Sequence, residues 1–207
     1  MCFSASVSFA ASGGLAVIGV ASFRLANRKQ KLIAAIPFFF AIQQAFEGFQ
    51  WITVSSGQVS IMAAYGFMFF ALLLWPLYIP VTVFVLDKKR RKVLQWIVGI
   101  GVALTLYYFI LLLLEPIGVH VFDRSIHYQI NTPFGIAVGI LYFVAVCGAL
   151  LLSSKWAFRW GGIAVFVSAI LTAVFSFATF ASVWCFFAAL LSSLIYFYLK
   201  YPQQMIK

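Results

Sequence analysis

Seven long apolar runs, separated by short polar segments, constrain what this chain can fold into. A helix needs about 20 apolar residues to cross the hydrocarbon core of a bilayer. Runs of about that length cover residues 4–23, 32–54, 61–86, 93–114, 133–154, 161–177 and 181–199. Only 9% of the residues are charged, against about 25% in soluble domains, which excludes a soluble globular fold. We therefore expect an all-α membrane protein, a single domain over residues 1–207 built as a seven-transmembrane-helix bundle.

The basic residues predict how this bundle is oriented. Thirteen of the 14 Lys and Arg residues lie in alternate loops and in the C-terminal tail, and Arg124 alone lies on the opposite side. Loops rich in Lys and Arg face the cytoplasm, so we expect the N-terminus outside and the C-terminus in the cytoplasm. Orientation also accounts for the net charge of +10, and we expect the bilayer as the partner and no nucleic acid.

Cys2 stands directly ahead of the first apolar run. A cleavable signal peptide carries positive charge before its apolar stretch, whereas here the first basic residue, Arg24, follows it. A lipoprotein cysteine follows an apolar region, and Cys2 precedes one. We expect the first run to be a retained helix with Cys2 at its outward tip; removal of the initiator methionine stays open.

Glu47 is the only acidic residue deep within a predicted span. Gln43, Glu47 and Gln50 recur at i, i+4 and i+7, which gives one face of the helix over 32–54 a polar character. A carboxyl group in hydrocarbon is costly, and such residues usually face the bundle interior and carry function. Glu47 is either a catalytic acid/base or ion site, or a glutamic acid that its glutamines hydrogen-bond between helices.

The predicted topology brings several metal-ligating residue types to the outer side of the membrane. They are Cys2, Glu47, Cys185, His120 and His127. Mixed sulfur, imidazole and carboxylate donors suit zinc or copper. Three interpretations of Cys2 and Cys185 stay open: a disulfide, two thiolate ligands, or two unpaired packed thiols. Cys147, near mid-membrane, is expected only to pack.

Other residues complete the predicted outward-facing pocket. The candidates are Ser4, Gln43, Gln44, Gln50, Trp51 and Trp184. Ser4 and Ser182 are also candidate N-caps of the first and last helices. Pro76 and Pro80 interrupt the third span, and the kink they predict serves either packing or gating.

Three classes of function remain open at this point. The chain binds a metal ion or small ligand in the outer pocket, with or without catalysis; or it is a proton- or cation-coupled transporter or channel that uses Glu47; or it is an accessory membrane subunit. Whether it forms a homo-oligomer is equally open.

Three motifs resemble those of a family of small, uncharacterised bacterial multi-pass membrane proteins. They are "MCFSA" at the start, "FAIQQAFEG" with a following tryptophan, and "SVWCFFAALLS" near the end. The resemblance implies a place in the bacterial inner membrane and implies no activity. The positions it carries over are Cys2, Phe3, Ser4, Gln43, Gln44, Glu47, Trp51, Ser182, Trp184 and Cys185.

Overall fold

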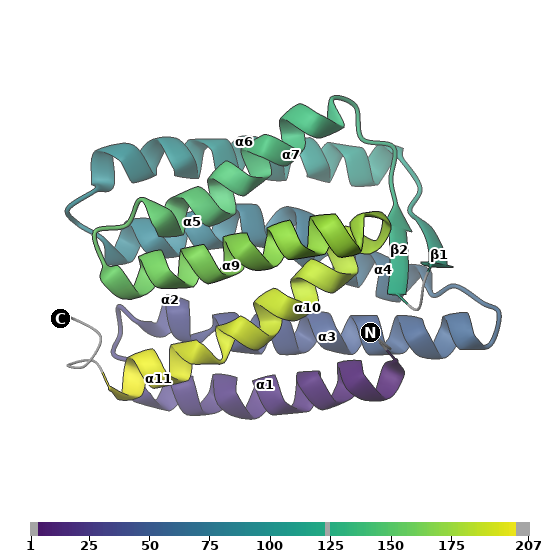
Figure 1. Ribbon diagram of the computed structural model, residues 1–207, viewed down its shortest axis with the longest axis horizontal. Helices are drawn as coiled ribbons and strands as arrows, with labels where there is room; N and C mark the ends of the chain where they lie inside the picture. Colours follow the sequence, from purple (N-terminus) through teal and green to yellow (C-terminus); the bar gives the residue numbers. More distant parts are fainter. Residues whose placement is uncertain (1–3, 123–124, 202–207) are drawn as a thin grey trace.

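Within residues 4–122 and 125–201, which the computed structural model describes, six helices are long and apolar enough to cross a membrane (Figure 1). They are α1 (Ala5–Leu25), α2 and α3 (Lys31–Ala34 and Ile36–Ser55), α4, η1 and α5 (Ile61–Met68, Phe69–Leu74 and Trp75–Leu86), α6 (Arg91–Leu114), α9 (Trp156–Phe175), and η3, α10 and α11 (Phe177–Thr179, Phe180–Ser192 and Leu194–Lys200). All six correspond to predicted spans. The span predicted over 161–177 begins earlier than expected, at Trp156, directly after the N-cap residue Lys155.

The seventh apolar helix is shorter than the other six. It consists of α7 (Gly135–Phe143), η2 (Val144–Gly148) and α8 (Ala149–Leu151), whereas the sequence predicted a span over 133–154. At about 1.5 Å per residue it extends over about 25 Å, less than the roughly 30 Å of a bilayer core. The residue before it, Phe134, adopts a left-handed conformation with φ of 56°, which starts the helix late.

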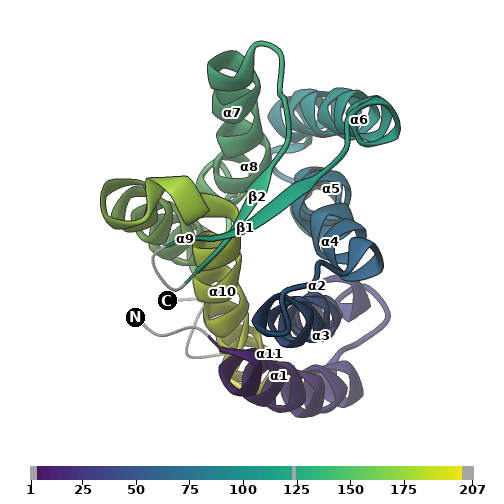
Figure 2. The ribbon, with the colours of Figure 1, turned by 90° about the vertical axis from the view of Figure 1, so that its right-hand side faces the viewer.

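A β-hairpin corrects the prediction of an all-α chain. Strands β1 (Gly118–Phe122) and β2 (Ser125–Gln129) pair antiparallel, with Val119 opposite Tyr128. Alternation along these strands puts Val119, Ile126 and Tyr128 on one face, where all three are buried. The hairpin lies across one end of the bundle, which we call the hairpin end (Figure 2).

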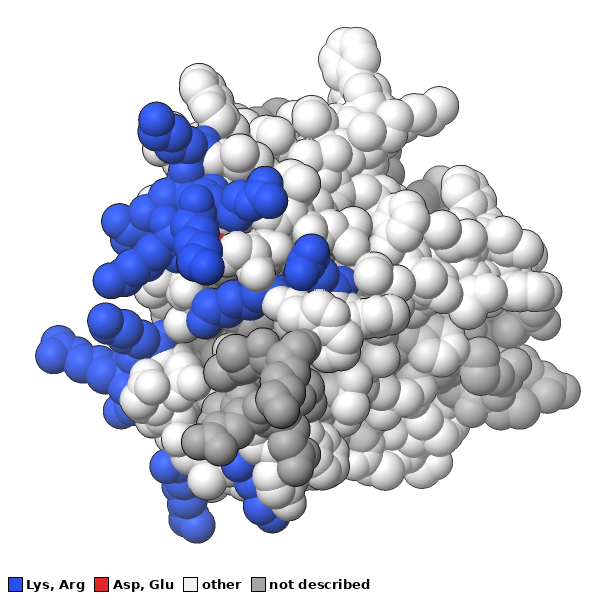
Figure 3. Space-filling view, turned by 60° about the vertical axis from the view of Figure 1, so that its left-hand side comes forward, with Lys and Arg blue, Asp and Glu red and all other residues white. Residues whose placement is uncertain are grey.

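The opposite end of the bundle is basic. Lys and Arg side chains gather there, on the turns after α1, α5 and α8 and at the end of α11 (Figure 3). We call it the basic end. Asp87 is buried among these charges and joins the turn after α5 to the turn after α8.

The two prolines of the third span follow a π-helical segment. Segment η1 leads into Trp75, whose N–H bonds the carbonyl of Phe70 five residues back. In that register Pro76, which has no N–H, leaves the carbonyl of Ala71 free. The hydroxyl of Tyr142 donates to this carbonyl at 2.5 Å, so a side chain of α7 supplies the missing donor. Neighbouring groups commonly satisfy freed carbonyls in this way inside membranes.

Candidate functional site

Glu47 is buried where three separate elements meet. It lies on α3 with 4% of its surface exposed. Tyr128 of β2 donates its hydroxyl to Oε2 at 2.9 Å. Ser182 of α10 donates its hydroxyl to Oε1 at 2.5 Å. Each carboxyl oxygen therefore accepts one hydrogen bond, and these bonds tie α3 to the hairpin and to α10.

Tyr128 is held in place by the hairpin and by an aromatic stack. Its ring lies parallel to that of Phe67, with centroids 4.6 Å apart. Burial raises the pKa of Tyr128 well above its usual range, and the nearby Glu47 adds to the shift. The phenol therefore keeps its proton and acts as a donor to Glu47 at physiological pH.

The glutamines of α3 do not bond Glu47, which corrects one interpretation of this polar face. Gln43, Gln44 and Gln50 are all almost completely buried. Gln43 Oε1 accepts from the indole N–H of Trp75 at 2.8 Å. Among the described residues no partner is found for Gln43 Nε2, for either amide atom of Gln44 or Gln50, or for Trp51 Nε1.

These partnerless amides are unusual. Most buried polar atoms in folded proteins are hydrogen-bonded, because an unmade bond in an apolar interior costs free energy. Here they cluster on the helix that also carries Glu47. The clustering leaves unsatisfied hydrogen-bonding capacity on the helix that carries Glu47.

Cys185 is a free, buried thiol next to Gln43, and it packs in the same buried cluster as Ile126 and Tyr128 of the hairpin. Cys147 is likewise free and buried in η2, where it packs in the apolar core as predicted. Cys2 lies outside the described residues.

The two histidines are not brought to Glu47. His120 and His127 face each other across the hairpin, and His120 is exposed. His127 Nδ1 hydrogen-bonds the carbonyl of Ala178, which fastens the hairpin to η3. Over residues 4–122 and 125–201, no three His, Cys, Asp or Glu side chains come together closely enough to hold a metal ion.

The remaining predicted pocket residues have separate roles. Ser4 is the N-cap of α1 and accepts from the N–H of Val7 at 3.4 Å, as expected. Ser182 was predicted to be a cap but lies inside α10, which begins at Phe180. Trp184 is buried and donates its indole N–H to the carbonyl of Val165 at 3.3 Å.

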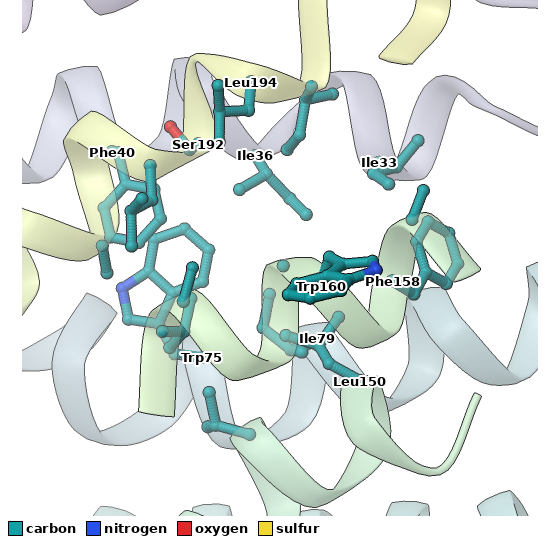
Figure 4. A pocket seen from close by; sticks show the side chains of 18 of the residues that line it. Ile33, Ile36, Phe40, Trp75, Ile79, Leu150, Phe158, Trp160, Ser192 and Leu194 are labelled. Atoms are coloured by element: carbon teal, nitrogen blue, oxygen red, sulfur yellow. The ribbon is translucent and has the colours of Figure 1, made fainter. Parts of the chain in front are cut away.

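An apolar cavity of about 300 Å³ extends from Cys185 toward the basic end. Its lining residues come from α2, α3, α5, the helix formed by α7, η2 and α8, and α9, α10 and α11 (Figure 4). Four tryptophans, Trp75, Trp156, Trp160 and Trp184, contribute to its walls. Cys185 and Trp75, which bonds Gln43, both line this cavity, so it adjoins the polar site around Glu47.

The sequence matches one family model over residues 1–206. The chain belongs to DUF6629, a family of unknown function. The match includes every residue of the DUF6629 chain placed in this site, and the family brings no activity with it. No curated protein and no solved structure matches the chain.

Sequence reasoning missed Tyr128 and assigned Ser182 a different role. Both contact Glu47, yet they lie 81 and 135 residues from it along the chain. The alternation of Val119, Val121, Ile126 and Tyr128 with polar residues was the available signal, because a period of two indicates strands.

Proposed function

We propose that this chain is an integral membrane protein whose outer half binds a small hydrogen-bonding ligand, with Glu47 exchanging a proton with it. In this proposal the chain crosses the membrane seven times, the hairpin end faces outside and the basic end faces the cytoplasm. The gathering of Lys and Arg at one end supports that orientation.

One observation carries the proposal: a buried carboxyl group with one donor on each oxygen, on the same helix as several buried amide atoms without described partners. A site built only to join helices would satisfy its own polar atoms. Partnerless donors and acceptors beside a titratable group are the arrangement that binding and proton transfer require.

The donor set favours an organic ligand over zinc or copper. The described residues offer one carboxyl group, amides, two hydroxyls and the Cys185 thiol. Zinc and copper prefer several thiolate or imidazole donors. The metal version of the proposal needs Cys2 as a further ligand. It is tested by titrating purified full-length protein with Zn²⁺ or Cu²⁺ and measuring retained metal, with Cys2→Ser as the comparison. Equal retention by both proteins contradicts it.

Dicyclohexylcarbodiimide tests the role of Glu47 directly, because this apolar reagent modifies protonated carboxyl groups within membranes. We expect intact-mass spectrometry to show one adduct on the wild-type protein at neutral pH and none on Glu47→Gln. Asp87→Asn is the matched control and keeps the adduct. A wild-type protein that stays unmodified, or an adduct that persists in Glu47→Gln, contradicts a reactive, proton-exchanging Glu47.

A second function, proton- or cation-coupled transport, is favoured by the two π-helical segments. Such segments often mark functional sites, and η1 is joined to α7 by the bond from Tyr142 to Ala71. Transport predicts proton or cation flux in proteoliposomes that Glu47→Gln abolishes while the protein still folds. Flux that survives the substitution contradicts it.

A further inference from the structure

The apolar cavity is a second feature, and neither Glu47 nor the glutamines of α3 are among the residues that line it. We propose that it holds one hydrocarbon chain of an anionic lipid, which enters from the cytoplasmic leaflet and leaves its headgroup at the basic end. This proposal goes beyond the proposed function, because none of its steps involves Glu47.

The interior of the cavity offers hydrocarbon contact and few free polar groups. Four polar side chains of its walls are already engaged with the protein. Trp75 bonds Gln43, Tyr142 bonds the carbonyl of Ala71, Trp184 bonds that of Val165, and Ser192 bonds that of Ala189. Apart from the Cys185 thiol, the other inner walls are aliphatic and aromatic, with Ile36 of α3 and Trp160 of α9 on opposite sides (Figure 4). Its volume of about 300 Å³ lies at the lower end of small-molecule sites.

The exposed lining residues of the cavity lie on α9 and α11, and from this we place its mouth between these two helices. Most lining residues are buried or half-buried, but Trp156, Trp160 and Leu194 are 45%, 52% and 52% exposed. These exposed residues are apolar and belong to helices that are apolar enough to cross a membrane. A lipid chain from the bilayer can therefore enter without crossing a polar surface.

Positive charge lies at the basic end of this cavity. The Lys155 ammonium lies 5.5 Å from the ring centroid of Phe158, a wall residue of the cavity. Arg159 lies in the first turn of α9, and Lys200 ends α11 with its ammonium over the rings of Tyr196 and Tyr201, so both belong to the basic end. Asp87 is buried nearby at the basic end, and its carboxylate accepts hydrogen bonds from the hydroxyls of Ser153 and Ser154. An anionic headgroup fits this charge, because Lys and Arg at a membrane surface attract anionic lipids.

Tryptophan quenching by 9,10-dibromostearate in nanodiscs tests the proposal, because four tryptophans line the cavity. We expect saturable quenching of the wild-type protein. A Cβ at Gly161, which lines the cavity, meets no atom within 4 Å, so Gly161→Leu places its side chain in the cavity. We expect it to weaken binding about tenfold, because a tenfold loss requires only that about two methylenes of the lipid chain lose their contact with the cavity walls.

Gly99→Leu is the matched control. Gly99 is also a helical glycine with no atom within 4 Å of its Cβ position, but it lies outside the cavity. We expect wild-type binding from it and from Glu47→Gln, which separates this proposal from the proposed function. Ala164→Leu, also in the cavity wall, gives a second filling variant should Gly161→Leu fold poorly.

The headgroup is tested with the double variant Lys155→Gln, Arg159→Gln. We expect it to bind dibromostearate about tenfold more weakly and the uncharged 9,10-dibromooctadecanol unchanged. Equal quenching of Gly161→Leu and Gly99→Leu overturns the cavity as the binding site. Wild-type affinity for the alcohol equal to that for the acid overturns the anionic headgroup, and leaves an uncharged chain as the occupant.

Discussion

Two buried carboxyl groups at opposite ends of the bundle are held very differently. Each oxygen of Asp87 accepts two hydrogen bonds. Oδ2 accepts from Ser153 Oγ and Ser154 N, and Oδ1 accepts from Ser154 Oγ and Lys89 N. Each oxygen of Glu47 accepts only one. The hydrogen bonding of the Asp87 carboxylate is complete, whereas the Glu47 carboxyl group can still accept further hydrogen bonds.

The surroundings of the two groups differ in the same direction. The donors around Asp87 come from two turns that the residue joins, so its bonds fix the basic end. The polar atoms around Glu47 include several buried amides without described partners. A carboxylate whose bonds are all made contributes to stability, and one beside unmade bonds is suited to binding. The following predictions test this division.

The largest effect on stability is expected from Asp87→Ala. Removing the carboxylate leaves the donors of Ser153 and Ser154 without their acceptor. We expect the free energy of unfolding to fall by about 3 kcal/mol. For a chain of this length that lowers Tm by about 6–12 °C. Thermal unfolding in detergent measures it, with Glu115→Ala as a control that changes Tm little. A Tm within about 2 °C of wild type contradicts a structural role for Asp87.

The pH dependence of stability should report the same carboxylate. Burial alone would raise the pKa of Asp87, but the hydrogen bonds from Ser154, Ser153 and Lys89 outweigh it, so the pKa lies below its ordinary value. A lowered pKa gives stability that is present above the unfolded-state value of about 3.9 and is lost as pH falls from there through the folded-state value. Wild-type Tm should therefore fall more steeply below pH 4 than the Tm of Asp87→Asn. The extra fall in the wild type should be smaller than the difference in Tm between wild type and Asp87→Ala at neutral pH. Parallel curves contradict this.

Much of the fold could be predicted because spans in a membrane follow from hydropathy alone. The six long helices and the basic loops needed only run length and charge. The hairpin could not be found that way, because its ten residues sit in a polar loop and depend on pairing with each other and on Tyr128 docking onto Phe67. The short seventh helix depends on the backbone at Phe134.

The candidate site was only half predictable, for the same reason. The polar face of α3, with Glu47 at its centre, follows from spacing within one helix. Its partners Tyr128 and Ser182 come from elements far away in the sequence, and no local pattern links them to it. No three of the four described residues of the expected metal set come together, because a shared side of the membrane does not imply contact: His127 bonds Ala178 and His120 is exposed. Cys2, the fifth residue of that set, lies outside the described residues.

Tyr128→Phe removes one of the two bonds to Glu47 and keeps the ring on Phe67. We expect the free energy of unfolding to fall by about 1.5 kcal/mol, since one bond to a buried carboxyl group is lost. Tyr107→Phe is the control, because that hydroxyl donates to Pro133 in an exposed position. Hydrogen exchange should also show faster opening of the hairpin in Tyr128→Phe. An unchanged hairpin contradicts the role of this bond in holding β2 to α3.

Glu47→Gln should have the smallest effect on stability of any substitution in this comparison. The amide keeps the shape of the side chain and one acceptor oxygen, and it removes a group that is costly to bury in hydrocarbon. We expect the free energy of unfolding to change by less than about 1 kcal/mol, because replacing a group that is kept for function often costs little stability. Thermal unfolding of Glu47→Gln and Asp87→Asn side by side decides the matter. If Glu47→Gln lowers the free energy of unfolding as much as Asp87→Asn does, both carboxyl groups serve mainly to stabilise the fold. The contrast between Glu47 and Asp87 would then be wrong.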